Sequence, residues 1–254
     1  MGILSYRSRA LWLLGYPEAA LADADRALHD AREIDHAATL MYALNHAAVA
    51  HILCGSYTAA GAELEELLVL ADEKSALFWK ALGTLIKSWL LALNGKNSDA
   101  IHMLTSGIAA YRLTGATLYV PLYMSYLASA HAELGQFDDA WRCIDEAMAA
   151  AETANESWYE AEINRIAGEI ALKLPRQDAV KADVYFDRAL MVARQQQAKS
   201  WELRAAMSMA RLWCHQGKRD EARNLLAPVY GWFTEGFDTR DLKETKTLLD
   251  ALAS

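Results

Sequence analysis

A six-residue stretch that begins with glycine and ends with alanine returns along the chain: GYPEAA at 15–20, GSYTAA at 55–60, GKNSDA at 95–100, GQFDDA at 135–140 and GKRDEA at 217–222. A reshaped copy, QDAVKA at 177–182, follows Pro175. The closing alanines are spaced 40, 40, 40, 42 and 40 residues apart. A fixed period of this size is typical of a repeat array in which one helical hairpin is copied along an axis.

Small residues recur on both sides of each turn. Seven residues before the turn glycine stand Ala48, Ser88, Ala128 and Ala210, and Gly168 stands seven residues before Pro175 of the reshaped turn. Four residues after the last five closing alanines stand Leu64, Leu104, Ile144, Phe186 and Leu226. Small residues that face each other let two helices approach closely. Each repeat is therefore predicted to be helix A, a glycine turn and helix B, with A and B in close contact.

The predicted fold is all-α, a right-handed α-solenoid of about six tetratricopeptide-like hairpins with a C-terminal capping helix. A single superhelical domain is expected over 1–254, because such a core grows with every repeat and escapes the size limit of a single core. The predicted repeats are about 1–34, 37–73, 76–113, 117–153, 157–197 and 200–230, and 231–254 forms the cap. Met1-Gly2 leads straight into a helical pattern, so we expect a fragment of a longer chain.

Composition narrows the class of protein. The formal net charge is −8, and Lys and Arg form no dense stripe, so no nucleic-acid partner is expected. We also expect no membrane partner, because no apolar run reaches the roughly 18 residues that a span requires. Three scattered cysteines, Cys54, Cys143 and Cys214, fit reduced half-buried side chains in a cytoplasmic protein.

The residue patterns of common active sites do not occur in the sequence. It has no G-x-x-x-x-G-K-[ST] phosphate loop, no His-Glu-x-x-His and no Cys-x-x-Cys pair. His51 and His131 occupy one repeat position, which packing explains better than metal binding. We therefore predict a chain that is not an enzyme, with no catalytic residue, cofactor or metal.

Helix A is expected to line the concave face if the repeats curl as tetratricopeptide repeats do. Counting 13, 10 and 6 residues back from each turn predicts a groove with one apolar and one charged half. Its residues are Tyr42, Asn45, Val49, Leu82, Leu85, Trp89, Glu162, Arg165, Glu169, Arg204 and Arg211. Such a surface suits an amphipathic helix or an extended peptide. The alternative is that Trp89 belongs to the core and the charged set is a self-paired face.

Three stretches carry a more specific resemblance: WYEAEINRIAGE at 158–169, WELRAA at 201–206 and YGWFTEGFDT at 230–239. They resemble the C-terminal tetratricopeptide region of large bacterial signalling proteins, in which an adenylate/guanylate cyclase or winged-helix domain precedes a predicted signal-transduction ATPase. The resemblance implies a non-catalytic regulatory domain that binds a protein or peptide, such as other domains of the parent chain. A small-inducer sensor and a self-associating scaffold, with a homodimer, remain the alternatives.

Overall fold

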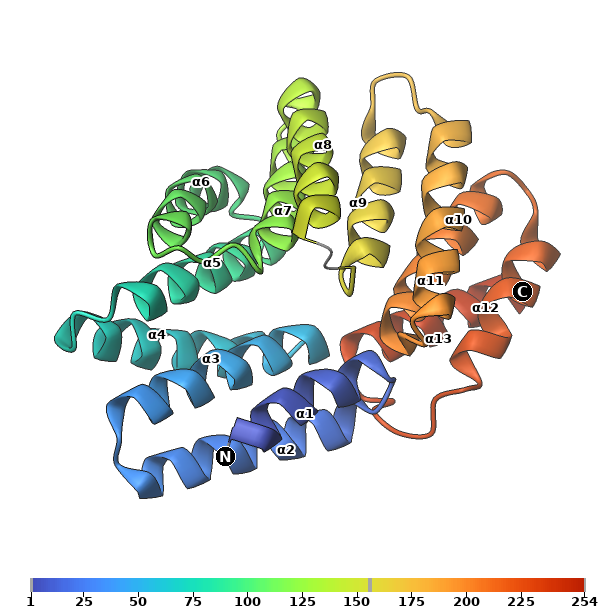
Figure 1. Ribbon diagram of the computed structural model, residues 1–254. Coiled ribbons are helices and arrows are strands. Elements are labelled where there is room, and N and C mark those ends of the chain that lie inside the picture. Colours follow the sequence, from blue (N-terminus) through green and yellow to red (C-terminus); the bar gives the residue numbers. More distant parts are fainter. Residues whose placement is uncertain (1, 155–156, 254) are drawn as a thin grey trace. The chain divides into compact units, whose positions relative to one another are not determined.

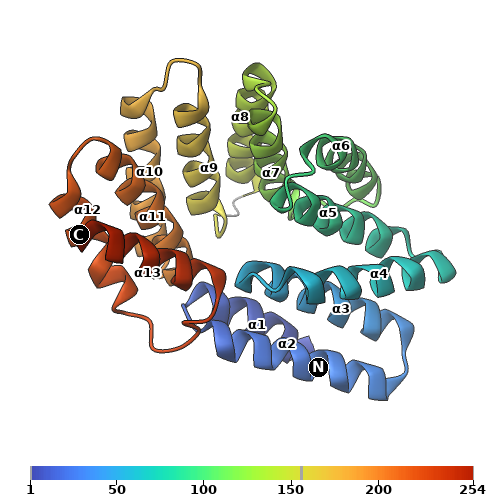
Figure 2. The same cartoon turned by 180° about the vertical axis from the view of Figure 1, so that it is seen from behind.

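Each sequence repeat folds into an antiparallel helical hairpin. The computed structural model describes residues 2–154 and 157–253, and all regular elements in those ranges are helices (Figures 1 and 2). The hairpins are α1 (Gly2–Leu13) with α2 (Pro17–Ile34), α3 (Ala37–Cys54) with α4 (Tyr57–Glu73), α5 (Leu77–Leu93) with α6 (Asn97–Leu113), α7 (Val120–Glu133) with α8 (Phe137–Ala154), α9 (Glu160–Lys173) with α10 (Ala179–Gln195), and α11 (Lys199–His215) with α12 (Arg219–Tyr230). A last helix, α13 (Arg240–Ala253), is the predicted closing helix. These helices confirm the α-solenoid fold class.

The predicted glycine turns are confirmed by their backbone. Gly15, Gly55, Gly95, Gly135 and Gly217 all have φ between 74° and 89°. At Gly55 the amide donates to the carbonyl of Ile52 at 3.1 Å, and the next amide reaches His51 at 2.8 Å, which closes the end of α3. The fifth turn uses other means: the Asp178 carboxylate accepts from the amide of Lys181 at 2.9 Å and caps α10.

Two helices start later than the sequence predicts. The prediction begins them at residues 117 and 157, whereas α7 begins at Val120 and α9 at Glu160. In both places a short turn comes first, and the carbonyl of Tyr119 or Tyr159 accepts the first helical hydrogen bond. Each tyrosine is thus the N-cap residue, and the chain before it is not helical.

The hairpin cores contain the small residues that the pattern predicts. All six closing alanines have no exposed surface: Ala20, Ala60, Ala100, Ala140, Ala182 and Ala222. On helix A, Ala48, Ser88, Ala128 and Ala210 are equally buried. A Cβ added to Gly168 would lie 2.6 Å from Cδ1 of Phe186, so only glycine fits opposite this ring. Close A–B packing therefore follows from the predicted residues.

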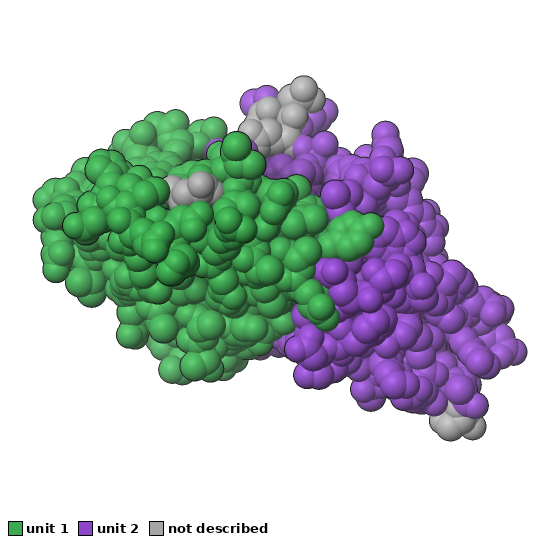
Figure 3. Space-filling view, turned by 90° about the horizontal axis from the view of Figure 1, so that it is seen from below, with its two compact units in different colours: residues 1–12, 16–117 green, residues 13–15, 118–254 purple. Residues whose placement is uncertain are grey.

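The chain divides into two compact units, one of residues 1–12 and 16–117 and the other of residues 13–15 and 118–254 (Figure 3). Within the first unit α2 packs on α3, α3 on α4 and α4 on α5. Within the second unit α9 packs on α10, α10 on α11 and α12 on α13, and the A-type helices α7, α9, α11 and α13 also contact one another in order. The single domain over 1–254 stays a prediction.

One helix corrects the expectation about membrane-length segments. By length and composition alone α3 is apolar enough to cross a membrane. It is also a core helix of its unit, with 61% of its residues buried, and core helices pass the same test. The polar side chains of Asn45, His46 and His51 lie within it. Its apolar character therefore reflects packing among α2, α4 and α5.

Candidate functional site

The structure places much of the predicted apolar half of the groove inside the hairpins. Asn45, Leu82, Leu85 and Trp89 are buried, and only Tyr42 and Val49 are half-buried. Leu85 faces its own helix B, because a Cβ on Gly107 of α6 would lie 3.0 Å from Leu85 Cδ2. Asn45 and Leu85 occupy the position ten residues before the turn, and Leu82 and Trp89 lie thirteen and six residues before it. Since all four are buried, they are core residues. This corrects their assignment to an exposed groove and favours the packing alternative that the sequence left open.

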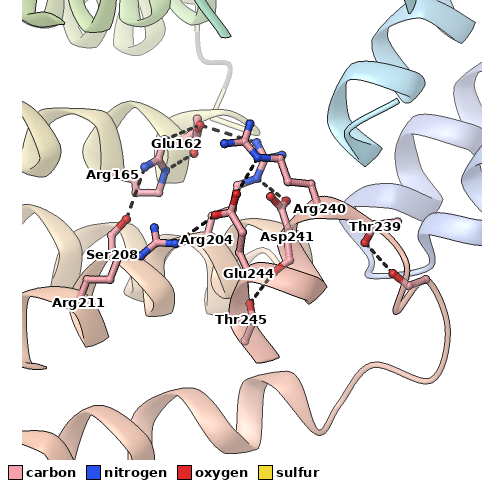
Figure 4. Close-up of polar contacts among 11 residues, drawn as sticks. Glu162, Arg165, Arg204, Ser208, Arg211, Thr239, Arg240, Asp241, Glu244 and Thr245 are labelled. Atoms are coloured by element: carbon pink, nitrogen blue, oxygen red, sulfur yellow. Dashed lines mark hydrogen bonds and ion pairs between the residues drawn. The ribbon is translucent and has the colours of Figure 1, made fainter. Parts of the chain in front are cut away.

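The predicted charged half is brought together in the second unit. Glu162 and Arg165 come from α9, and Arg204 and Arg211 come from α11 (Figure 4). Glu169 also lies on α9. Arg165 donates to Glu162 through Nε at 2.7 Å and through Nη2 at 3.0 Å, and its Nη1 lies 3.4 Å from Glu169. The Glu162 side chain is only 4% exposed. This paired geometry holds the guanidinium and the carboxylate in one plane.

Three further side chains complete the set, and the sequence did not predict them. Ser208 of α11 donates to Glu169 at 2.6 Å. From α13, Asp241 accepts from Arg204 Nε at 2.6 Å and Glu244 accepts from Arg211 at 3.1 Å (Figure 4). We call the eight residues on α9, α11 and α13 the arginine network: Glu162, Arg165, Glu169, Arg204, Ser208, Arg211, Asp241 and Glu244. The signal that could have found α13 is the period itself, since Glu244 lies 40 residues after Arg204.

Electrostatics stabilise the charged forms of these groups. Burial alone would lower the pKa of Arg165, but attraction by Glu162 outweighs it and the pKa is raised. The pKa of Arg204 is likewise raised by Asp241 and Glu162 against the effect of burial. Burial by itself would raise the pKa of Glu244. Arg240 and then Arg211 lower the pKa by more than this, so it lies below its ordinary value. The charged forms of Arg165, Arg204 and Glu244 are therefore favoured.

The charges of the arginine network also act on Tyr126 of the neighbouring helix α7. Burial, followed by the negative charge of Glu162, raises the pKa of Tyr126 well above its ordinary value. Tyr126 therefore keeps its proton beside the arginine network. A neutral phenol here adds no charge that Arg165 or Arg204 would have to balance.

The arginine network has a buried interior and an open rim. Arg165 and Arg204 are 20% and 18% exposed, whereas Arg211 is 46% exposed. The interior ties α9, α11 and α13 together, because each of its guanidinium groups meets carboxylates from more than one direction. The rim can exchange partners with solutes, since exposed ion pairs are weak. Chemically, the site can accept a carboxylate at Arg211 without losing its interior.

A second buried polar group lies in the first unit. His51 Nδ1 of α3 lies 2.9 Å from Glu63 Oε2 of α4, and its Nε2 lies 3.5 Å from Asp25 of α2. Burial lowers the pKa of His51, but Glu63 and then Asp25 outweigh it, and the pKa is raised. Among residues 2–154 and 157–253, no group of three or more His, Cys, Asp or Glu side chains could hold a metal ion. The His51 group is a polar tie between helices.

The fold places the chain in a class of protein: it is a tetratricopeptide-like helical-repeat protein. No family model matches the chain, and no curated protein matches it. Two of the solved structures that share the fold are similar to this chain over most of its length. The apo form of RapI has a TM-score of 0.68 and 12% identity, over 98% of this chain and 83% of that one. Aspartyl phosphate phosphatase F from Bacillus subtilis has a TM-score of 0.63 and 14% identity, over 94% of this chain and 60% of that one.

Proposed function

We propose that this chain is the interaction and regulatory domain of a bacterial signalling protein and that it binds a protein or peptide through the rim of the arginine network. The carrying observation is that Arg211 is half-exposed and donates to Glu244 at 3.1 Å, beside the interior in which Arg165 and Arg204 are largely buried. A partner carboxylate can replace Glu244 at this guanidinium. The interior then keeps α9 and α11 in place during the exchange.

The resemblance described in the sequence analysis suggests the compartment and the neighbouring domains of this chain. We propose that the chain works in the cytoplasm beside the cyclase, winged-helix or ATPase domains of a parent protein. Two observations support a reducing compartment: Cys54 and Cys143 are buried and belong to no disulfide, and burial raises the pKa of Cys143 to about 11. Partner binding would change the curvature of the repeat array and so shift a neighbouring domain between two states.

Capture from a lysate of the source bacterium tests the proposal with two matched variants. Arg211→Glu reverses the charge at the rim, whereas Arg223→Glu makes the same reversal at an exposed position on α12. We expect a specific protein that the wild type and Arg223→Glu retain and that Arg211→Glu loses. Equal retention by both variants would contradict binding at the rim. Arg165 and Arg204 are left intact because their reversal would break the interior of the arginine network.

A further inference from the structure

Two guanidinium groups share one carboxylate at the rim of the arginine network. Arg211 of α11 donates to Glu244 at 3.1 Å, and Arg240 of α13 donates to the same carboxylate through Nε at 2.7 Å (Figure 4). All three side chains are partly open to solvent: Arg211 is 46% exposed, Arg240 49% and Glu244 38%. Two positive charges thus meet one negative charge at a place that a ligand can reach.

A third cation lies on the same side of α13. Lys243 is exposed and stands three positions after Arg240, so the two side chains leave the helix on one side. Beside Glu244, three cations therefore face one anion, although the formal net charge of the whole chain is −8. The excess of positive charge is a local property of this rim and not of the chain.

The other partly exposed carboxylates of the arginine network have donors of their own. Asp241 accepts from Arg204 Nε at 2.6 Å, and Glu169 accepts from the hydroxyl of Ser208 at 2.6 Å. Glu169 also lies 3.4 Å from Arg165. These pairs belong to the interior that ties the helices together, so the charge that would balance the rim has to come from another molecule.

From this arrangement we infer that the rim binds a phosphate monoester, carried by a phosphorylated side chain of the protein partner. The inference rests on the proposed function and names the group that Arg211 receives. A phosphate monoester carries a charge between about −1.5 and −2 at pH 7, and its three oxygens accept hydrogen bonds from two guanidinium forks at once. A carboxylate of the partner would only repeat the single charge of Glu244, whereas a phosphate in its place also supplies the second charge.

Phenyl phosphate and benzoate are the probes, because they carry the same ring on a dianion and on a monoanion. Each is titrated into the isotope-labelled whole chain, and NMR follows the Nε–Hε signals of the arginines. We expect saturable binding of phenyl phosphate that is at least about tenfold tighter than that of benzoate. Arg240→Gln should weaken it about tenfold. The matched control Arg223→Gln changes an exposed arginine on α12 and should bind normally.

Glu244→Gln gives a test with the opposite sign. Removal of this charge should tighten the binding of phenyl phosphate roughly threefold or more, because the phosphate no longer competes with a like charge for the two guanidinium groups. A merely structural role of Glu244 would not tighten binding. Circular dichroism checks that both rim variants, Arg240→Gln and Glu244→Gln, keep their helices.

Three outcomes of the titrations would overturn the inference: no saturable shift with phenyl phosphate, equal affinity for benzoate, or weaker binding by Glu244→Gln. Capture from the lysate then separates this inference from the proposed function. A partner that is lost after phosphatase treatment of the lysate supports the phosphate. A partner that is captured equally well after the treatment, but still lost by Arg211→Glu, overturns the phosphate and leaves the proposed function in place. Retention by Arg211→Glu overturns both.

Discussion

Helices α5 and α9 occupy equivalent places in their repeats and fill them with opposite chemistry. Thirteen and ten residues before the turn, α5 has Leu82 and Leu85, whereas α9 has Glu162 and Arg165. Leu82, Leu85 and Glu162 are all buried, and Arg165 is four-fifths buried. The repeat geometry thus fixes how deeply a position is buried and leaves its chemistry open. A leucine side chain is stable at a buried position without a polar partner, whereas an ionised side chain is stable there only when its partners are in place.

The largest expected effect comes from removing Glu162. Glu162→Ala leaves Arg165 without its paired carboxylate and takes a counter-charge from Arg204, so we expect a loss of about 4 kcal/mol in the free energy of unfolding. Urea unfolding followed by circular dichroism measures it. Glu160→Ala on the same helix removes the partner of the half-exposed Arg188 and should cost less than about 1 kcal/mol. Similar losses in the two variants would contradict a buried ionised interior.

An acid titration tests the buried histidine of the first unit. His46 of α3 is buried, and burial followed by repulsion from Arg9 lowers its pKa to about 3. The unfolded histidine takes up a proton near pH 6.5 and the folded one does not, so stability falls as the pH drops below that value. Between pH 7 and pH 5 we expect a loss of about 2 kcal/mol from this group.

The variant His46→Phe keeps an aromatic ring beside Tyr6 and Tyr42 and should lack this loss. The measurement is urea unfolding of both proteins at pH 7 and pH 5. The comparison isolates His46 because the raised pKa of His51 acts in the opposite direction and is present in both proteins. An equal loss in the two proteins would refute the assignment to His46.

The fifth hairpin offers a test of close helix packing. Four repeats oppose leucine or isoleucine with alanine or serine, whereas Phe186 is opposed by Gly168. Gly168→Ala should destabilise by about 1–2 kcal/mol, because the cost of overpacking exceeds the gain in helix propensity. Adding Phe186→Leu should restore most of it. Gly61→Ala is the control, since its added Cβ would approach nothing nearer than 3.9 Å; a similar loss there would rule out a clash with Phe186.

The smallest effect is expected at the rim of the arginine network. Arg211→Ala removes an exposed ion pair with Glu244, so the free energy of unfolding, measured by thermal unfolding, should change by no more than about 0.5 kcal/mol. In 1 M salt even this difference should vanish, whereas the cost of Glu162→Ala should persist because buried pairs are screened little. A loss above about 2 kcal/mol for Arg211→Ala would place Arg211 in the interior instead.

Most of the fold could be predicted from the sequence because its signals are local. The turn glycines need a positive φ, and the small residues before and after them have no alternative role at this spacing. Helix ends were therefore predicted to within one or two residues, except where Tyr119 and Tyr159 cap α7 and α9 after a short turn. The starts of these two helices depend on which carbonyl accepts the first hydrogen bond, and the apolar pattern does not record it.

The candidate site was predicted only in part. Counting from the turns selected Glu162, Arg165, Glu169, Arg204 and Arg211. The first four of these residues do meet, and Arg211 pairs with Glu244 of α13, which the count did not select. The same count placed Leu85 and Asn45 in a groove, although both are buried. A count along one helix gives the direction of a side chain but does not show what lies beyond it.

The sequence by itself determined the repeat, the hairpins and the buried small residues, because each depends on neighbours within about 40 residues at a constant spacing. Only the tertiary structure decided that α13 takes the place of another helix A and brings Asp241 and Glu244 to Arg204 and Arg211. It also decided that Asn45 and Leu85 lie in the core and not in a groove. Both outcomes depend on which surfaces meet in space, and that depends on the whole packed chain.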